Sequence, residues 1–255
     1  VVITAIVFSQ WTYLAVFFLI TLFSMLEFYK LVGLDGLLPL KFWGTFTAIL
    51  LLVISFLIQA ELAGQNLYYI ILPVATCIFF IKLYKKNDLK PFTNIAYTFL
   101  GIIYIGVPFS LMNFLAFHFG GYTFDIVVGL LLLIWASDTG AYFAGTTLGK
   151  RKLFARISPK KSWEGFVGGA VLALIFVMGL SYFLHSLTTQ QWFIVGIIII
   201  VGGTFGDLIE SLFKREAGVK DSGRFFPGIG GILDLMDSLL FNAPLMYLYL
   251  RHVLT

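Results

Sequence analysis

Apolar runs close to 20 residues long recur along this chain, and they constrain its fold more than any other feature. A helix of about 20 apolar residues is long enough to cross the hydrocarbon core of a bilayer. The runs are continuous rather than alternating, and they are too long to be strands. The sequence therefore predicts an all-α, polytopic transmembrane protein with eight complete spans, at about 11–28, 42–60, 67–84, 96–117, 124–143, 166–185, 192–212 and 232–250.

Residues 1–8 form a shorter apolar stretch that ends at the polar pair Ser9-Gln10. Because it is too short to span, we expect it to be the tail of a truncated first helix, which gives nine spans in all. Composition agrees with a membrane location, since 60% of the residues are hydrophobic and 12% are charged, against about 25% charged residues in soluble domains. The single cysteine, Cys77, excludes an intramolecular disulfide and a cysteine-based zinc site.

The distribution of basic residues predicts the orientation. Sixteen of the seventeen Lys and Arg residues fall in the loops at about 29–41, 82–95, 146–165 and 213–231, and Arg251 is the exception. Cytoplasmic loops of membrane proteins carry the excess of Lys and Arg. We therefore expect a multi-pass protein of the cell (inner) membrane whose basic side, with the active site, faces the cytoplasm. The net charge of +4 reflects this topology and indicates no nucleic-acid partner.

Four carboxylates lie inside or at the edge of the late spans: Asp138, Asp207, Asp234 and Asp237. An ionisable residue within a span is costly and is by default a functional hypothesis. Asp234 and Asp237 are three residues apart on one helical face, and Asp207 shares a face with Glu210. Clustered carboxylates must be protonated or neutralised by a cation, and oxygen ligands of this kind suit Mg²⁺. We expect the acids to form one site in the cytoplasmic third of the membrane.

Two basic segments, 150–161 and 214–224, flank these acids. In the plainer interpretation they mark topology and attract anionic lipid headgroups, while the acids pair with Lys214, Arg215 or Arg224 and hold helices together. In the functional interpretation the cations hold phosphates and the acids hold a metal ion. The glycine-rich loop 227–231 leads directly into a helix, whose free N–H groups favour an anion.

The stretch 211–237 reads SLFKREAGVKDSGRFFPGIGGILDLMD. It resembles the signature of the phosphatidate cytidylyltransferases, also called CDP-diacylglycerol synthases. Stretches 137–142 and 158–165 resemble a second conserved region of that family. The positions that match the signature are Ser211, Lys214, Arg215, Lys220, Asp221, Gly223, Pro227, Gly230, Gly231, Asp234 and Asp237.

The resemblance implies transfer of the cytidylyl group of CTP to phosphatidic acid, giving CDP-diacylglycerol and pyrophosphate. It implies Mg²⁺, with room for a second cation, and the option of a homodimer. We expect residues 1–95 to be a transmembrane scaffold and 96–255 to be the catalytic region. The expected metal ligands are Asp207 and Asp234. The expected catalytic residues are Asp138, Asp221, Asp237, Lys214, Arg215 and Lys220. The expected substrate-binding residues are Ser158, Lys160, Lys161, Ser211, Arg224, Gly230 and Gly231.

Two positions depart from the family pattern. Ile229 stands where the family has His, and Leu235 stands where it has Arg. Both changes leave the metal ligands in place and predict weakened catalysis. Two other functions remain open at this point: a CTP-dependent lipid-alcohol kinase, and a cation or proton transporter. Transporters usually place such acids near the midplane, whereas we expect these acids to lie on one side.

Overall fold

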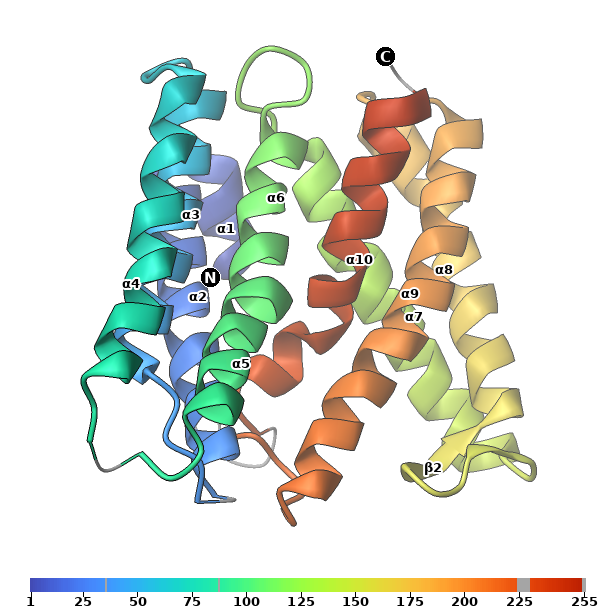
Figure 1. The fold of residues 1–255 in the computed structure, drawn as a ribbon. Helices are drawn as coiled ribbons and strands as arrows, with labels where there is room; N and C mark the ends of the chain where they lie inside the picture. The colour runs from blue at the N-terminus through green and yellow to red at the C-terminus, as the bar shows by residue number, and fades with distance from the viewer. Residues whose placement is uncertain (35, 87, 224–229, 254–255) are drawn as a thin grey trace. The chain divides into compact units, whose positions relative to one another are not determined.

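The computed structural model describes residues 1–34, 36–86, 88–223 and 230–253 (Figure 1). The chain forms two compact units. Unit 1 contains residues 1–122 and 216–236, and unit 2 contains residues 123–215 and 237–255. The predicted helical class is confirmed, because the described residues form long helices and one short β-hairpin. The functional division at residue 95 concerns activity and stays a prediction.

Unit 1 is helical, and its elements follow one another in chain order. They are α1 (Val2–Phe8), α2 (Gln10–Gly33), α3 (Lys41–Gln59), the 3₁₀ helix η1 (Gln65–Ile70), α4 (Ile71–Leu83), α5 (Pro91–Gly101), the π-helical turn η2 (Ile102–Gly106) and α6 (Val107–Ala116).

The elements α5, η2 and α6 form one helical stretch, 91–116. Its start lies five residues before the expected start at 96, because Pro91 occupies the first helical turn, where a missing N–H costs nothing. The stretch packs closely on Tyr29 of α2, whose hydroxyl donates to the Thr98 carbonyl at 2.7 Å. A Cβ at Gly44 would lie 2.0 Å from the Tyr29 hydroxyl oxygen, so glycine makes room for this ring.

A buried polar cluster ties the end of α4 to the start of α5. Lys82 forms an ion pair with Asp88, and both side chains are almost fully buried. Asn94 donates to Asp88 at 2.6 Å. Burial alone would raise the pKa of the Asp88 carboxyl, but the hydrogen bonds from Lys82, the Lys90 N–H and Asn94 outweigh it and lower this pKa. The charged pair therefore joins the end of α4 to the loop before α5.

Unit 2 contains α7 (Asp125–Leu148), α8 (Trp163–Phe183), α9 (Thr189–Glu216) and most of α10 (Ile232–Val253). Strands β1 (Lys152–Phe154) and β2 (Ser158–Ser162) form an antiparallel hairpin between α7 and α8 (Figure 1). This hairpin lies within the loop expected at 146–165, where no strand was predicted. Glu164 in the first turn of α8 accepts from the Lys150 and Arg151 N–H groups at 3.0 and 3.2 Å, which closes the hairpin.

Small residues bring α7 and α8 together. A Cβ at Gly140 would lie 2.6 Å from the Gly168 carbonyl oxygen, and a Cβ at Gly168 would lie 2.2 Å from the Ala144 Cβ. Helices in membranes associate through such small residues, since lipid supplies no hydrophobic drive between them. This contact fixes the orientation of α7 and therefore the direction in which its Asp138-bearing face points.

Seven helical stretches in the described part of the chain are long and apolar enough to cross a membrane. They lie at Gln10–Gly33, Lys41–Gln59, Gln65–Leu83, Pro91–Ala116, Asp125–Leu148, Trp163–Phe183 and Thr189–Glu216. Helix α10 is not among the seven, and α1 has seven residues. A polytopic membrane protein is therefore supported, whereas the count of nine spans stays a prediction.

Candidate functional site

A cavity of about 530 Å³ lies within unit 2. Four of the expected site residues with charged side chains line it: Asp138, Asp207, and Lys160 and Lys161 of β2. Its other walls are largely apolar or small. A cavity of this size, with a few polar groups in an apolar lining, is typical of small-molecule sites. We refer to it as the unit 2 cavity.

Asp207 is the best connected carboxylate of this cavity. Its Oδ2 lies 2.5 Å from the Lys161 Nζ, and its Oδ1 accepts from the Ser211 hydroxyl at 3.1 Å. The side chains of Lys161 and Asp207 remain 24% and 36% exposed. The pair therefore keeps access to a ligand in the cavity.

The position of Asp207 follows from the close packing of α9 on α10. A Cβ at Gly206 would lie 2.7 Å from the Asp237 carbonyl oxygen, and a Cβ at Gly202 would lie 2.2 Å from Asn242 Oδ1. Ser238 donates to the Gly203 carbonyl at 3.3 Å. Glycines before Asp207 thus let α10 approach, and Ser238 lines the same cavity.

Other expected site residues of unit 2 have structural partners. Lys214 forms an ion pair with buried Glu210, one helical turn away. Arg215 donates to the Ile157 carbonyl at 3.4 Å and so ties α9 to the hairpin. Asp237 is buried and accepts from the Ser238 N–H. The plainer interpretation paired Lys214 with one of the four aspartates, and Glu210 is not one of them.

The expected substrate-binding serines, Ser158 and Ser211, lie on different elements, β2 and α9. Ser158 is the first residue of β2 and is half-buried. Ser211 contacts Asp207 directly. The structure thus brings together Asp138, Lys160, Lys161, Asp207 and, through its hydrogen bond, Ser211.

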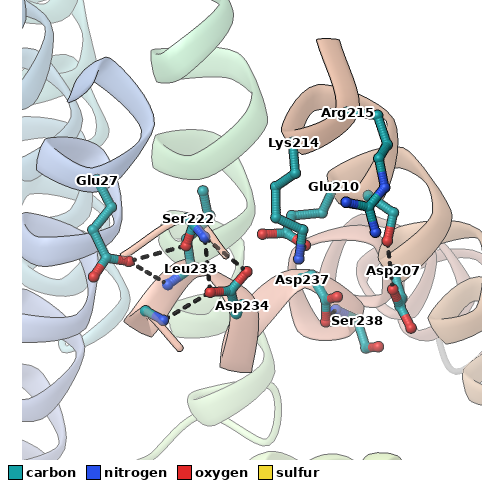
Figure 2. A network of polar contacts seen from close by, with 12 residues as sticks. Glu27, Asp207, Glu210, Lys214, Arg215, Ser222, Leu233, Asp234, Asp237 and Ser238 are labelled. Carbon is teal, nitrogen blue, oxygen red and sulfur yellow. Dashed lines mark hydrogen bonds and ion pairs between the residues drawn. The ribbon is translucent and has the colours of Figure 1, made fainter. Parts of the chain in front are cut away.

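Asp234 lies in unit 1, in the first turn of α10. Its Oδ2 accepts from the Gly231 N–H at 2.7 Å and from the Ser222 N–H at 3.0 Å (Figure 2). The N–H of Gly231, which the sequence analysis expected to bind substrate, is therefore engaged by a carboxylate of the chain itself. Gly230 has φ of +115°, which favours glycine, and a Cβ there would lie 2.5 Å from Asp234 Oδ2.

Sequence reasoning missed a second carboxylate in unit 1. Glu27 of α2 accepts from the Leu233 N–H at 2.8 Å and from the Ser222 hydroxyl at 3.4 Å (Figure 2). The available signal was an acid inside an apolar run, which is itself a reason to suspect function. We call Glu27, Ser222, Gly231, Leu233 and Asp234 the α10 cap.

The remaining expected residues are less constrained. Lys220 and Asp221 are exposed in the segment between α9 and α10. Arg224 and Ile229 lie outside the described residues, and Leu235 is 39% exposed on α10. The expected metal ligands Asp207 and Asp234 belong to different units. Within the residues that the structure describes, no three His, Cys, Asp or Glu side chains are grouped closely enough to hold a metal ion, so a shared cation stays a prediction.

Comparisons with known proteins bear on this arrangement. A family model described as the cytidylyltransferase family matches residues 1–253. A protein of Staphylococcus haemolyticus named phosphatidate cytidylyltransferase is 35% identical over 234 residues, which cover 90% of this chain and 87% of that protein. Proteins of the same name from Staphylococcus aureus and Haemophilus influenzae are each 40% identical. Those two matches cover 65% and 64% of this chain, and 62% and 58% of the relatives. The chain belongs to the cytidylyltransferase family.

Proposed function

We propose that this protein transfers the cytidylyl group of CTP to phosphatidic acid, giving CDP-diacylglycerol and pyrophosphate. The observation that carries the proposal is the unit 2 cavity, where Asp138, Asp207 and two lysines meet largely apolar walls in a membrane protein of this family. The phosphate of the lipid and the triphosphate of CTP need cations to neutralise their negative charge, and the acyl chains need apolar surroundings. The name phosphatidate cytidylyltransferase, carried by the relatives, supports the same pair of substrates.

The reaction needs charge neutralisation and alignment more than a general base. A phosphate monoester has its second pKa near about 6, so the lipid phosphate is largely dianionic at neutral pH. One of its oxygens forms the new bond to the α-phosphorus of CTP, and the bond from that phosphorus to the pyrophosphate oxygen breaks. We propose that Lys160 and Lys161, which line the cavity, neutralise phosphate oxygens and that Ser211 orients Asp207 through its hydrogen bond. Fixed charges aimed at the developing negative charge commonly provide the largest part of such catalysis.

Mg²⁺ fits the donor set of the cavity. Asp138 and Asp207 contribute hard carboxylate oxygens to the lining of the cavity, and Mg²⁺ is usually bound by one or two carboxylates together with substrate phosphates. When bound, the ion would neutralise phosphate charge and polarise a phosphorus–oxygen bond. We propose Asp207, with Asp138, as its ligands in unit 2, and Asp234 as the further ligand that the family signature implies.

We also propose the finer topology. Helix α10 has 22 residues and would cross as an eighth span, with residues 1–8 belonging to a ninth. The basic loops would face the cytoplasm, which would bring CTP to the cavity from that side. An impermeant thiol reagent on intact cells should then label Gln190→Cys and miss Lys152→Cys, both in a Cys77→Ser background. The reverse labelling pattern would contradict this orientation. A homodimer is a further proposal, based on the family resemblance.

One product analysis tests the function. Purified protein in detergent would receive phosphatidic acid, Mg²⁺ and CTP labelled at either the α- or the γ-phosphate. We expect the α-label in the lipid phase and the γ-label in pyrophosphate, with neither in lipid when phosphatidic acid is omitted. Transfer of the γ-label to a lipid alcohol would instead support the kinase. Absence of label from lipid under all conditions would contradict both enzymes.

A further inference from the structure

Glu27 reaches the signature segment from the part of the chain that the sequence analysis assigned to scaffold. It lies in α2, 206 residues from Leu233 and 195 residues from Ser222. Its Oε2 accepts from the Leu233 N–H and from the Ser222 hydroxyl. All three residues belong to unit 1, so this contact is internal to one compact body.

The contact satisfies the start of a helix. The first N–H groups of a helix have no partner within it, and negative charge there is stabilising. Leu233 is the second residue of α10, and its N–H is taken by Glu27. Asp234 takes the N–H groups of Gly231 and Ser222. Two carboxylates from distant parts of the sequence thus hold one helix start and the segment before it.

The glycines of the signature are shaped around Glu27. A Cβ at Gly223 would lie 2.3 Å from Glu27 Oε1, and a Cβ at Gly231 would lie 2.4 Å from Glu27 Oε2. Neither glycine has positive φ, so backbone conformation does not require them. The space that they leave is occupied by the Glu27 carboxylate. The two glycines of the signature therefore leave room for the carboxylate of Glu27, a residue outside the signature.

We propose that Glu27 is a positioning residue for the reaction. It fixes the start of α10 and the segment around Ser222, and through them the carboxylate of Asp234. This inference rests on the proposed function, because it assigns Asp234 to the site. Reactions of this kind depend on alignment to a fraction of an ångström, so loss of Glu27 lowers turnover more than it lowers nucleotide affinity.

Kinetics of a matched series test the proposal. Glu27→Ala should lower kcat at least 30-fold, with the KM for CTP within threefold of the parent. Glu27→Gln keeps an oxygen that accepts from Leu233 and should retain at least one third of the parent kcat. Glu61→Ala, which removes an exposed acid of the same unit, is the control and should be unchanged. Parent-like kcat in Glu27→Ala would overturn the proposal, and so would an equal loss in Glu27→Gln and Glu27→Ala.

A second measurement covers the case in which Glu27→Ala does not fold. Glu27→Asp shortens the side chain by one methylene and should lower kcat at least tenfold, below the value for Glu27→Gln. The reverse order would overturn the proposal. Failure of the proposed function is distinguishable, because the parent would then form no CDP-lipid. Failure of this inference leaves the parent active.

Discussion

The unit 2 cavity and the α10 cap both contain carboxylates of apolar helices, but their partners differ. In the cavity, Asp207 faces a lysine and a hydroxyl and remains 36% exposed. In the cap, Glu27 and Asp234 face backbone N–H groups and the Ser222 hydroxyl. A carboxylate opposed by a lysine beside open space can exchange its partner for a ligand. A carboxylate bound to backbone N–H groups also holds the chain in place. The difference indicates that the cavity binds substrate, whereas Glu27 of the cap maintains the alignment of the proposed ligand Asp234.

The largest expected effect concerns the two expected metal ligands. Asp207→Asn and Asp234→Asn should each lower turnover at least 100-fold, because charge neutralisation at a phosphoryl centre is commonly worth several kcal/mol. The CTP and phosphatidic acid assay measures this directly. Asp125→Asn, at the first residue of α7 and bonded to Ser186, is the control. Turnover within tenfold of the parent in either variant would remove that residue from the site.

The second prediction concerns the two departures from the family pattern. The double variant Ile229→His, Leu235→Arg should raise kcat at least tenfold at saturating CTP and Mg²⁺. A guanidinium on the first turns of α10 would add a fixed positive charge for phosphate, and Leu235 is exposed enough to accept it. Leu248→Arg, at another exposed position of α10, controls for added charge. Unchanged activity would show that these positions do not limit the reaction.

The third prediction uses the free energy of unfolding to distinguish a carboxylate that holds the fold from one that binds substrate. Asp234→Ala should lower the free energy of unfolding by about 1–2 kcal/mol, because it leaves N–H groups at a helix start without their acceptor. Asp207→Ala removes a partly exposed ion pair and should cost about 0–1 kcal/mol. Thermal unfolding in detergent compares the two. A larger loss in Asp207→Ala than in Asp234→Ala would reverse the roles that we assign to the two regions.

Much of this fold was predictable, because apolar runs mark helices that need no partner to be recognised. Seven of the eight complete spans expected have a counterpart among the seven long apolar stretches, with ends shifted by a few residues. The hairpin at 152–162 was missed, because three- and five-residue strands among cations carry no clear alternation. Glu27 was missed for a different reason: nothing local to it reveals a partner 206 residues away.

The candidate site was predictable in its residue types and less so in its arrangement. The spacing of Asp207 and Ser211 places them on one helical face, and the structure has them in contact. The pairing of Lys161 with Asp207 needs a tertiary contact that no spacing gives. The Gly231 N–H was expected to bind substrate, whereas in the structure it donates to Asp234. A sequence alone does not show which acceptor lies nearest to an N–H group at a helix start.

The smallest expected effect concerns Lys161. Lys161→Gln should raise the KM for CTP about fivefold and leave the unfolding midpoint within about 2 °C of the parent, since the pair with Asp207 is partly exposed and worth little to stability. Lys152→Gln, in β1 and exposed, is the matched control and should leave KM unchanged. An equal rise in both variants would indicate a general effect of basic charge near the membrane surface and would contradict a specific role for Lys161.

The central claim is that the unit 2 cavity binds the nucleotide through charge, whereas Glu27 of the α10 cap acts by holding the chain. Equilibrium binding of labelled CTP to purified protein, measured with and without Mg²⁺, tests it most directly. In the parent and in Glu27→Gln we expect Mg²⁺ to strengthen CTP binding to the same extent. In Asp207→Asn we expect most of that strengthening to be lost in a protein with the parent unfolding midpoint. Full Mg²⁺-dependent strengthening in Asp207→Asn, together with its loss in Glu27→Gln, would contradict the account.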